Sequence, residues 1–111
     1  MDILFKERKF EKQCNEYALL TRAHGNRRAQ LIRVRLDALR AAGCLEDLRN
    51  ISGRLHELKG NRKGQLSLDL DHPYRLIFIP GHDPVPSTED GGMDWARITI
   101  VKILGIEDTH E

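Results

Sequence analysis

Hydrophobic residues recur at helical spacing through the first part of the chain. One stripe at i, i+4, i+7 and i+11 predicts an apolar helix face made of Phe10, Cys14, Tyr17 and Thr21. A break is expected at 24–26. A second helix is predicted over 27–42, with Asn26 as its N-cap and Gly43 just beyond its end. Its broad apolar face comprises Leu31, Ile32, Val34, Leu36, Ala38, Leu39 and Ala42. The two segments predict a helical hairpin.

The hydrophobic period changes to two later in the chain. After a short strand at 2–5 and a helical turn within 44–51, alternating leucines predict a half-buried strand over 66–71. Asp71-His72-Pro73 is a turn, and 74–79 is a second strand ended by Pro80. The β-branched run in 95–104 predicts a strand at the centre of the sheet. The intervening irregular stretch, 80–94, is either functional or disordered.

Helices followed by strands predict an α+β domain. We expect an N-terminal helical hairpin packed on one face of a mainly antiparallel sheet of about four strands. At 111 residues the chain is expected to form a single domain, 1–111, with one core.

Composition indicates a protein of the cytoplasm without membrane attachment. Hydrophobic residues make up 40% of the chain and charged residues 32%, and no apolar run approaches the length of a bilayer span. An acid at Asp2 argues against an export signal. Cys14 and Cys44 are 30 residues apart and are expected to be buried free thiols rather than a disulfide.

Charge is distributed unevenly along the chain. Residues 1–63 carry 15 Lys and Arg against 8 Asp and Glu, whereas residues 64–111 carry 3 against 9. This asymmetry predicts a basic surface for a polyanion, or else two halves that neutralise each other in the fold. Several arginines fall on the polar side of the helical hairpin, either as a solvated face or as an electrostatic footprint: Arg27, Arg28, Arg33, Arg35 and Arg40.

The segment from His56 to Phe78 carries the candidate chemistry. The loop 59–64 has a glycine at 60 and at 64 that would let the backbone turn, and Arg62 and Lys63 between them could donate to phosphate oxygens. Cleavage of RNA by its own 2′-hydroxyl needs a base, a cation for the phosphorane and an acid for the leaving oxygen. His56 and Lys59, three residues apart, could reach one cleft.

Arg75 is an unexpected cation within an apolar strand. A guanidinium there should point into a cleft or pair with an acid such as Asp69 or Asp71. His110 is the residue before Glu111 and, considered by itself, is a candidate tail residue.

No metal or cofactor is expected. His24, His72 and His82 lie in predicted turns or loops without ligand spacing, and no phosphate-binding or dinucleotide fingerprint occurs. Tyr74 and Trp95 could stack on bases, although at such strand positions they are more often core residues.

Three strings together resemble the RelE/ParE superfamily of bacterial toxins, and specifically its HigB-like branch: His56-Glu57-Leu58-Lys59-Gly60-Asn61-Arg62-Lys63-Gly64-Gln65, Tyr74-Arg75-Leu76-Ile77-Phe78 and Ile106-Glu107-Asp108-Thr109-His110. The likeness spans nearly the whole chain. It implies a toxin of a type II toxin–antitoxin system, a ribosome-dependent endoribonuclease (mRNA interferase) that inhibits translation. It also implies a cognate HigA-like antitoxin, with operator DNA bound only through that antitoxin.

The resemblance also implies the site residues. His56 and Lys59 match the family's catalytic His and Lys, Arg75 its phosphate-stabilising arginine, and His110 a C-terminal histidine of the site. Two positions depart from the pattern: Asp69 stands where an arginine is frequent, and Thr109 where a tyrosine is common. A carboxylate beside the scissile phosphate would repel it or hold Arg75 in an ion pair.

These departures motivate a second hypothesis, a RelE/ParE-fold protein that acts by binding. It would be a gyrase poison or an inactive relative within an antitoxin–DNA complex. A general RNA-binding module is a third.

Overall fold

The computed structural model describes residues 1–51 and 54–108. Its helices and strands, in chain order, are β1 (Asp2–Phe5), α1 (Arg8–Asn15), α2 (Tyr17–His24), α3 (Asn26–Ala41), β2 (His56–Glu57), β3 (Leu66–Asp69), β4 (Tyr74–Pro80) and β5 (Ile100–Asp108). Short 3-10 turns occupy Leu45–Leu48, Gly60–Arg62 and Trp95–Arg97. This order confirms the α+β class predicted from the sequence.

The strands form one sheet in the order β1-β5-β4-β3-β2. The β2–β3, β3–β4 and β4–β5 pairs are antiparallel, and β1 pairs parallel to β5. The mainly antiparallel sheet is therefore confirmed, with five strands in the described part of the chain instead of about four. The additional strand is β2, whose two residues are too few to give a period-two signal.

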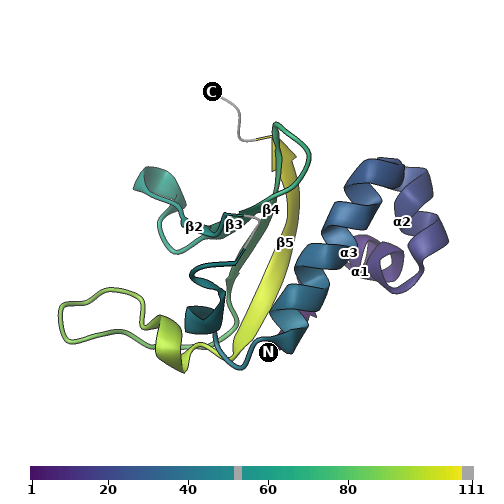
Figure 1. Ribbon diagram of the computed structural model, residues 1–111. Helices are drawn as coiled ribbons and strands as arrows, with labels where there is room; N and C mark the ends of the chain where they lie inside the picture. The colour runs from purple at the N-terminus through teal and green to yellow at the C-terminus, as the bar shows by residue number, and fades with distance from the viewer. Residues whose placement is uncertain (52–53, 109–111) are drawn as a thin grey trace.

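The helices pack on one side of the sheet, and the segment from β2 to β3 extends toward the other side (Figure 1). The hydrophobic core lies between the helices and the sheet. From α3 it includes Ile32, Leu36 and Leu39, each at most 2% exposed. The sheet supplies Leu66, Leu68, Leu76, Phe78, Val101 and Ile103. Each of these large side chains contributes about 1.5–3 kcal/mol by leaving water, so α3 is held to the sheet mainly by this burial.

The first predicted helix is divided in two. Glu16 takes an extended conformation between α1 and α2, with φ −131° and ψ 97°. Tyr17, expected on the apolar face, is 41% exposed, whereas Leu20 is 1% exposed. The break rotates α2 so that Leu20 reaches the core. Burial of this side chain stabilises the tertiary structure, and local periodicity does not reveal it.

Two element boundaries also differ from the prediction. Asn26 is the first residue of α3, and Gly25 with φ +83° precedes it as the cap. Residues 95–97 form a 3-10 turn, and the last strand runs from Ile100 to Asp108 instead of over 95–104. The predicted central place of this strand is confirmed, since β5 lies between β1 and β4.

The irregular stretch 80–94 folds back on itself. Ser87 and Met93 form an antiparallel bridge, and the amide of Gly91 donates to the carbonyl of Thr88 at 2.9 Å. In Figure 1 this hairpin projects away from the sheet below β2 and β3.

The two cysteines are free thiols. Burial raises the pKa of the Cys14 thiol to about 12. In the described part of the chain, every helix is too short or too polar to cross a bilayer.

Arg28 on α3 clamps the β3–β4 turn. Its Nε donates to Asp71 Oδ1 at 2.9 Å and its Nη2 to Asp71 Oδ2 at 3.1 Å, while its guanidinium lies 3.6 Å from the centroid of the Tyr74 ring. The hydrogen bonds from Arg28 hold the pKa of the Asp71 carboxyl below its usual value. One α3 side chain thus fixes the entrance to β4, the strand that carries Arg75.

We expect Asp71→Asn to destabilise the protein by about 1 kcal/mol at neutral pH, because a partly buried bidentate pair becomes a weaker neutral contact. Since the folded-state pKa is depressed, the ionic contribution is present above the unfolded value of about 3.9 and is lost as pH falls through the folded value. Urea unfolding at several pH values measures it. A difference between wild type and variant that persists unchanged at pH 2 would contradict the linkage; Asp83→Asn, in the exposed loop, is the control.

Candidate active site

The sheet face opposite the helices carries most of the predicted site. Successive side chains on a strand point to opposite faces, so the leucines of β3 that enter the core leave Ser67 and Asp69 on the other side. His56 pairs in register with Ser67, and Arg75 pairs with Asp69. Four polar residues from β2, β3 and β4 therefore share one face.

An alternating row of charges crosses this face. Arg75 lies between Asp69 on β3 and Glu107 on β5 in the strand register. Arg75 Nε is 3.3 Å from Asp69 Oδ1, and Arg54 Nε approaches Asp69 Oδ2 at 3.8 Å. At the other end, Arg62 contacts Glu107 at 2.6 Å. Three guanidiniums thus alternate with two carboxylates, and the row keeps a net positive charge.

This row decides between the two predictions for Arg75. Its side chain is 35% exposed and pairs with Asp69, while Asp71 is bound to Arg28 on the opposite side of the strand. Because Asp69 Oδ1 is buried and makes no hydrogen bond in the described structure, the contact with Arg75 is an ion pair without good hydrogen-bond geometry.

The basic loop takes the form expected from its glycines. Gly60 and Gly64 have φ of +65° and +93°, conformations that side-chain-bearing residues rarely adopt. Lys59 and Lys63 are exposed on either side of the 3-10 turn. Arg62 instead turns inward: its guanidinium donates to Oε1 of Gln65 and to both carboxylate oxygens of Glu107, and the hydrogen bonds to Glu107 raise the pKa of Arg62. Arg62 ties the loop to β5.

His56 is half-buried at the edge of the sheet. Its Nε2 is buried and has no hydrogen-bond partner in the described structure, and the same is true of Ser67 Oγ. Ser67 is completely buried. Buried polar atoms without partners cost free energy, and they are uncommon outside sites where a ligand or reaction uses them. Three such atoms, on His56, Ser67 and Asp69, lie on one face.

Three members of this arrangement were not predicted as site residues. The alternation of 65–71 predicted that Ser67 would face solvent, whereas it is completely buried. Arg54 lies in a loop without any motif, and Glu107 was noted only within the C-terminal string. Cross-strand register joins them, and a single sequence does not report register.

Of the predicted site residues, His110 is outside the residues that the structure describes. His24 hydrogen-bonds Gln13 across α1 and α2 at 3.0 Å, and His82 Nε2 accepts from the amide of Thr99. Among residues 1–51 and 54–108, no three His, Cys, Asp or Glu side chains gather in a way that could hold a metal ion.

Tyr74 and Trp95 are both engaged by arginines. Arg28 covers the Tyr74 ring, and Arg49 lies 4.2 Å from the Trp95 ring centroid. Trp95 Nε1 also donates to Glu57 Oε1 at 2.9 Å. Both rings pack against the core, the more frequent role predicted from the sequence for aromatic residues at such positions.

Known structures share this fold over their full length. The YoeB–YefM complex from Staphylococcus aureus matches with a TM-score of 0.56 and 18% identity, and the YoeB dimer from the same organism with 0.55 and 20%. A heterotetrameric YoeB–YefM toxin–antitoxin complex gives 0.54 and 18%. Each alignment covers 100% of this chain and 98% of the other. At these identities the likeness establishes the fold.

Sequence comparison establishes the family. A search among curated proteins found no match. Residues 5–86, about three quarters of the chain, match the model of the HigB-like toxins, described as RelE-like toxins of the type II toxin–antitoxin system HigB. The chain therefore belongs to the HigB-like family of type II toxins, a family of ribosome-dependent endoribonucleases.

Proposed function

We propose that this toxin is an active, metal-independent endoribonuclease that cuts mRNA on the ribosome, in the cytoplasm, and so inhibits translation. The observation that carries the proposal is the shared sheet face, where the unpartnered Nε2 of His56 lies on the same side as Arg75 and the buried hydroxyl of Ser67. A titratable imidazole and a guanidinium on one surface suit phosphodiester cleavage by the neighbouring 2′-hydroxyl.

Roles follow from the chemistry of the side chains. His56 and His110 share the acid and base steps, one taking the proton of the 2′-hydroxyl and the other protonating the 5′ oxygen as the P–O bond breaks. Arg75 and Lys59 stabilise the charge that builds on the phosphorane. Lys63, exposed on the loop, binds a neighbouring phosphate. Arg62 binds a phosphate only if it leaves Glu107 or shares its N–H donors between Glu107 and the phosphate.

Asp69 limits the rate in this proposal. A scissile phosphate beside Arg75 meets the carboxylate that now pairs with it, and the two anions repel each other. The phosphate must therefore compete with Asp69 for Arg75. The exposed Arg54, which also approaches Asp69, can neutralise the carboxylate when Arg75 turns to RNA.

The partners follow from the family. A cognate, HigA-like antitoxin neutralises the toxin. The targets of the toxin are the ribosome and its mRNA. Operator DNA is reached only through the antitoxin. The YoeB–YefM complexes show that this fold assembles with an antitoxin in relatives.

The Asp69–Arg75 pair also favours a second candidate, a toxin of the same fold that acts by binding. A gyrase poison or an inactive relative would keep this ion pair closed throughout. A third, a general RNA-binding module, would bind RNA with a salt slope that reflects several phosphates and would cleave neither on nor off ribosomes.

We expect His56→Ala and Arg75→Ala each to lower mRNA cleavage on purified ribosomes by about 10²–10⁴-fold, the usual cost of losing a general acid, a general base or a charge-stabilising donor. Growth inhibition on induction should fall in parallel. Arg27→Ala, an exposed arginine of α3, is the matched control and should remain toxic. Full toxicity of both site variants would exclude this site.

Asp69→Asn should raise the cleavage rate about two- to fivefold. The substitution keeps the shape of the side chain while removing a partly exposed ion pair worth roughly 0.2–1 kcal/mol. Single-turnover cleavage on programmed ribosomes measures the change, with Asp83→Asn as control. A tenfold loss of rate would mean that Asp69 positions Arg75 instead of competing for it.

Ser67→Ala should stabilise the fold and weaken the enzyme. Removing a buried hydroxyl without a partner is expected to raise the free energy of unfolding by roughly 1 kcal/mol, while cleavage falls because the site loses a polar group beside His56. Urea unfolding and ribosome cleavage are measured on the same preparation, with Ser87→Ala as the exposed control. A destabilised variant of unchanged activity would show that Ser67 has a structural role.

A further inference from the structure

The sheet has an open edge along the second half of β5. β1 pairs with β5 only over Ile100–Ile103, and the amide of Lys6 makes the last bond, to the carbonyl of Ile103 at 2.9 Å. Beyond it, Gly105–Asp108 pairs with β4 on one side, and Leu104 is the position skipped where the register shifts. On the other side, no strand within residues 1–51 and 54–108 pairs with Leu104–Glu107.

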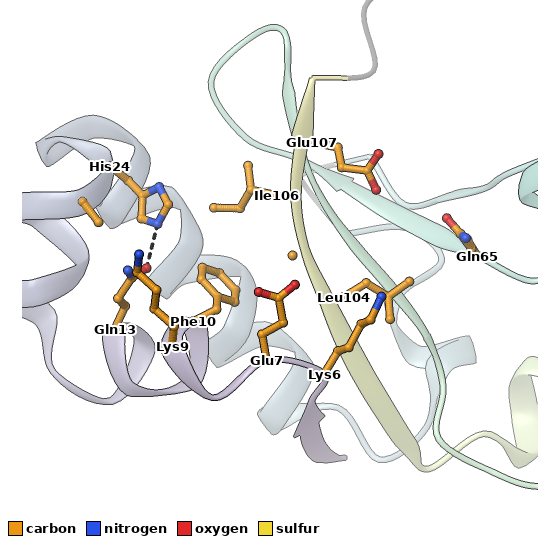
Figure 2. Close-up of a pocket in the computed structure, with 12 residues that line it drawn as sticks. Lys6, Glu7, Lys9, Phe10, Gln13, His24, Gln65, Leu104, Ile106 and Glu107 are labelled. Carbon is orange, nitrogen blue, oxygen red and sulfur yellow. Dashed lines mark hydrogen bonds between the residues drawn. The ribbon is translucent and has the colours of Figure 1, made fainter.

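A groove runs beside this open edge. Its volume is about 680 Å³, and it lies between the helices α1 and α2 and the end of β5 (Figure 2). Apolar side chains form its middle: Phe10, Ala23, Leu104 and Ile106. Polar and charged side chains surround them, including Lys6, Glu7 and Lys9.

The geometry of the edge suits one more strand. The chain leaves the sheet after Phe5 and starts α1 at Arg8, so no strand of the described chain continues beside Leu104–Glu107. Four residues at about 3.4 Å each offer roughly 14 Å of strand. Unpaired edge backbone is a ready template for an extended segment from another chain.

Charge around the groove selects the kind of segment. Lys6 and Lys9 are exposed on its rim, and an adjoining hollow on the same helices is lined by Lys9, Lys12 and Arg22. Glu107 is already bound by Arg62, so Glu7 is the other acid in the described lining. The excess of cations favours an acidic partner.

We propose that the antitoxin docks here, adding an extended, acidic segment as a strand on the open edge of β5. An apolar side chain of that segment fits between Phe10 and Ile106, and its acids face Lys6 and Lys9. The inference rests on the antitoxin partner named above and is independent of nuclease activity. It also reaches the proposed site, because Glu107 both lines the groove and holds Arg62.

Hydrogen–deuterium exchange of the toxin alone and of the purified toxin–antitoxin complex tests the docking. Amides of 104–107 that face the open edge should exchange at least about tenfold more slowly in the complex, since strand addition supplies their hydrogen-bond acceptors. Stable complex formation without protection of this segment would overturn the proposal and leave the proposed nuclease intact.

Charge reversal gives a second, independent measurement. Lys6→Glu with Lys9→Glu should weaken antitoxin binding about tenfold or more and make it less salt-dependent, because two attractive rim charges become repulsive. Arg8→Glu with Arg27→Glu is the matched control, since both arginines are exposed and neither lines the groove. Equal loss in both pairs would show only a general charge effect and would contradict the docking site.

A second copy of this chain is the competing occupant. It would protect 104–107 in the toxin alone and give a concentration-dependent mass in sedimentation, and either result would reject the antitoxin segment. mRNA cleavage on the ribosome by the Lys6→Glu, Lys9→Glu variant, measured without antitoxin, separates the docking proposal from the proposed nuclease activity. Normal cleavage together with weak antitoxin binding supports both the docking site and the nuclease.

Discussion

The antiparallel register of β3, β4 and β5 is the constraint on which the site depends. It sets Arg75 between Asp69 and Glu107, and those two carboxylates in turn hold Arg54 and Arg62 from separate loops. A slip of one residue would turn the site side chains of the shifted strand to the core face. The leucines and Phe78 on the opposite face oppose such a slip, because they would become exposed to water.

The same register links the site to the rest of the molecule. Arg28 of α3 binds Asp71 within the β3–β4 turn, and Arg35 of α3 donates to the carbonyl of Asp69, the last residue of β3. On β5, Glu107 connects the loop 59–64, through Arg62, to the groove beside α1 and α2. Core packing on one face therefore positions an electrostatic network on the other. The network is partly self-neutralised, which limits repulsion among its cations in the absence of RNA.

Much of this arrangement could be predicted from the sequence because it depends on local pattern. The helix over 27–42 follows from a strong apolar face, and the leucine alternation before Asp71 locates β3. The family strings predict His56, Lys59 and Arg75 as site residues, and the roles of these residues stay a prediction. The division of the first helix at Glu16 could not be predicted, since it depends on Leu20 reaching the core. Burial of Ser67 and the pairing of Arg62 with Glu107 also depend on contacts between distant segments, which periodicity does not encode.

For Asp69, the sequence and the structure supply complementary observations. The sequence showed an acid where an arginine is frequent, and the structure shows that this acid pairs with Arg75 on the predicted site face. An ion pair of this kind, 26–35% exposed, is weak enough for a phosphate to displace. The site is thus compatible with cleavage, at a rate that the competition lowers.

Mapping the 5′ ends of cellular mRNA after induction of the toxin tests the central claim most directly. We predict new 5′ ends of mRNA within translated codons for the wild-type chain. These ends should be absent when translation is blocked, and absent for His56→Ala. Growth arrest by the wild-type chain without any new mRNA ends would contradict it.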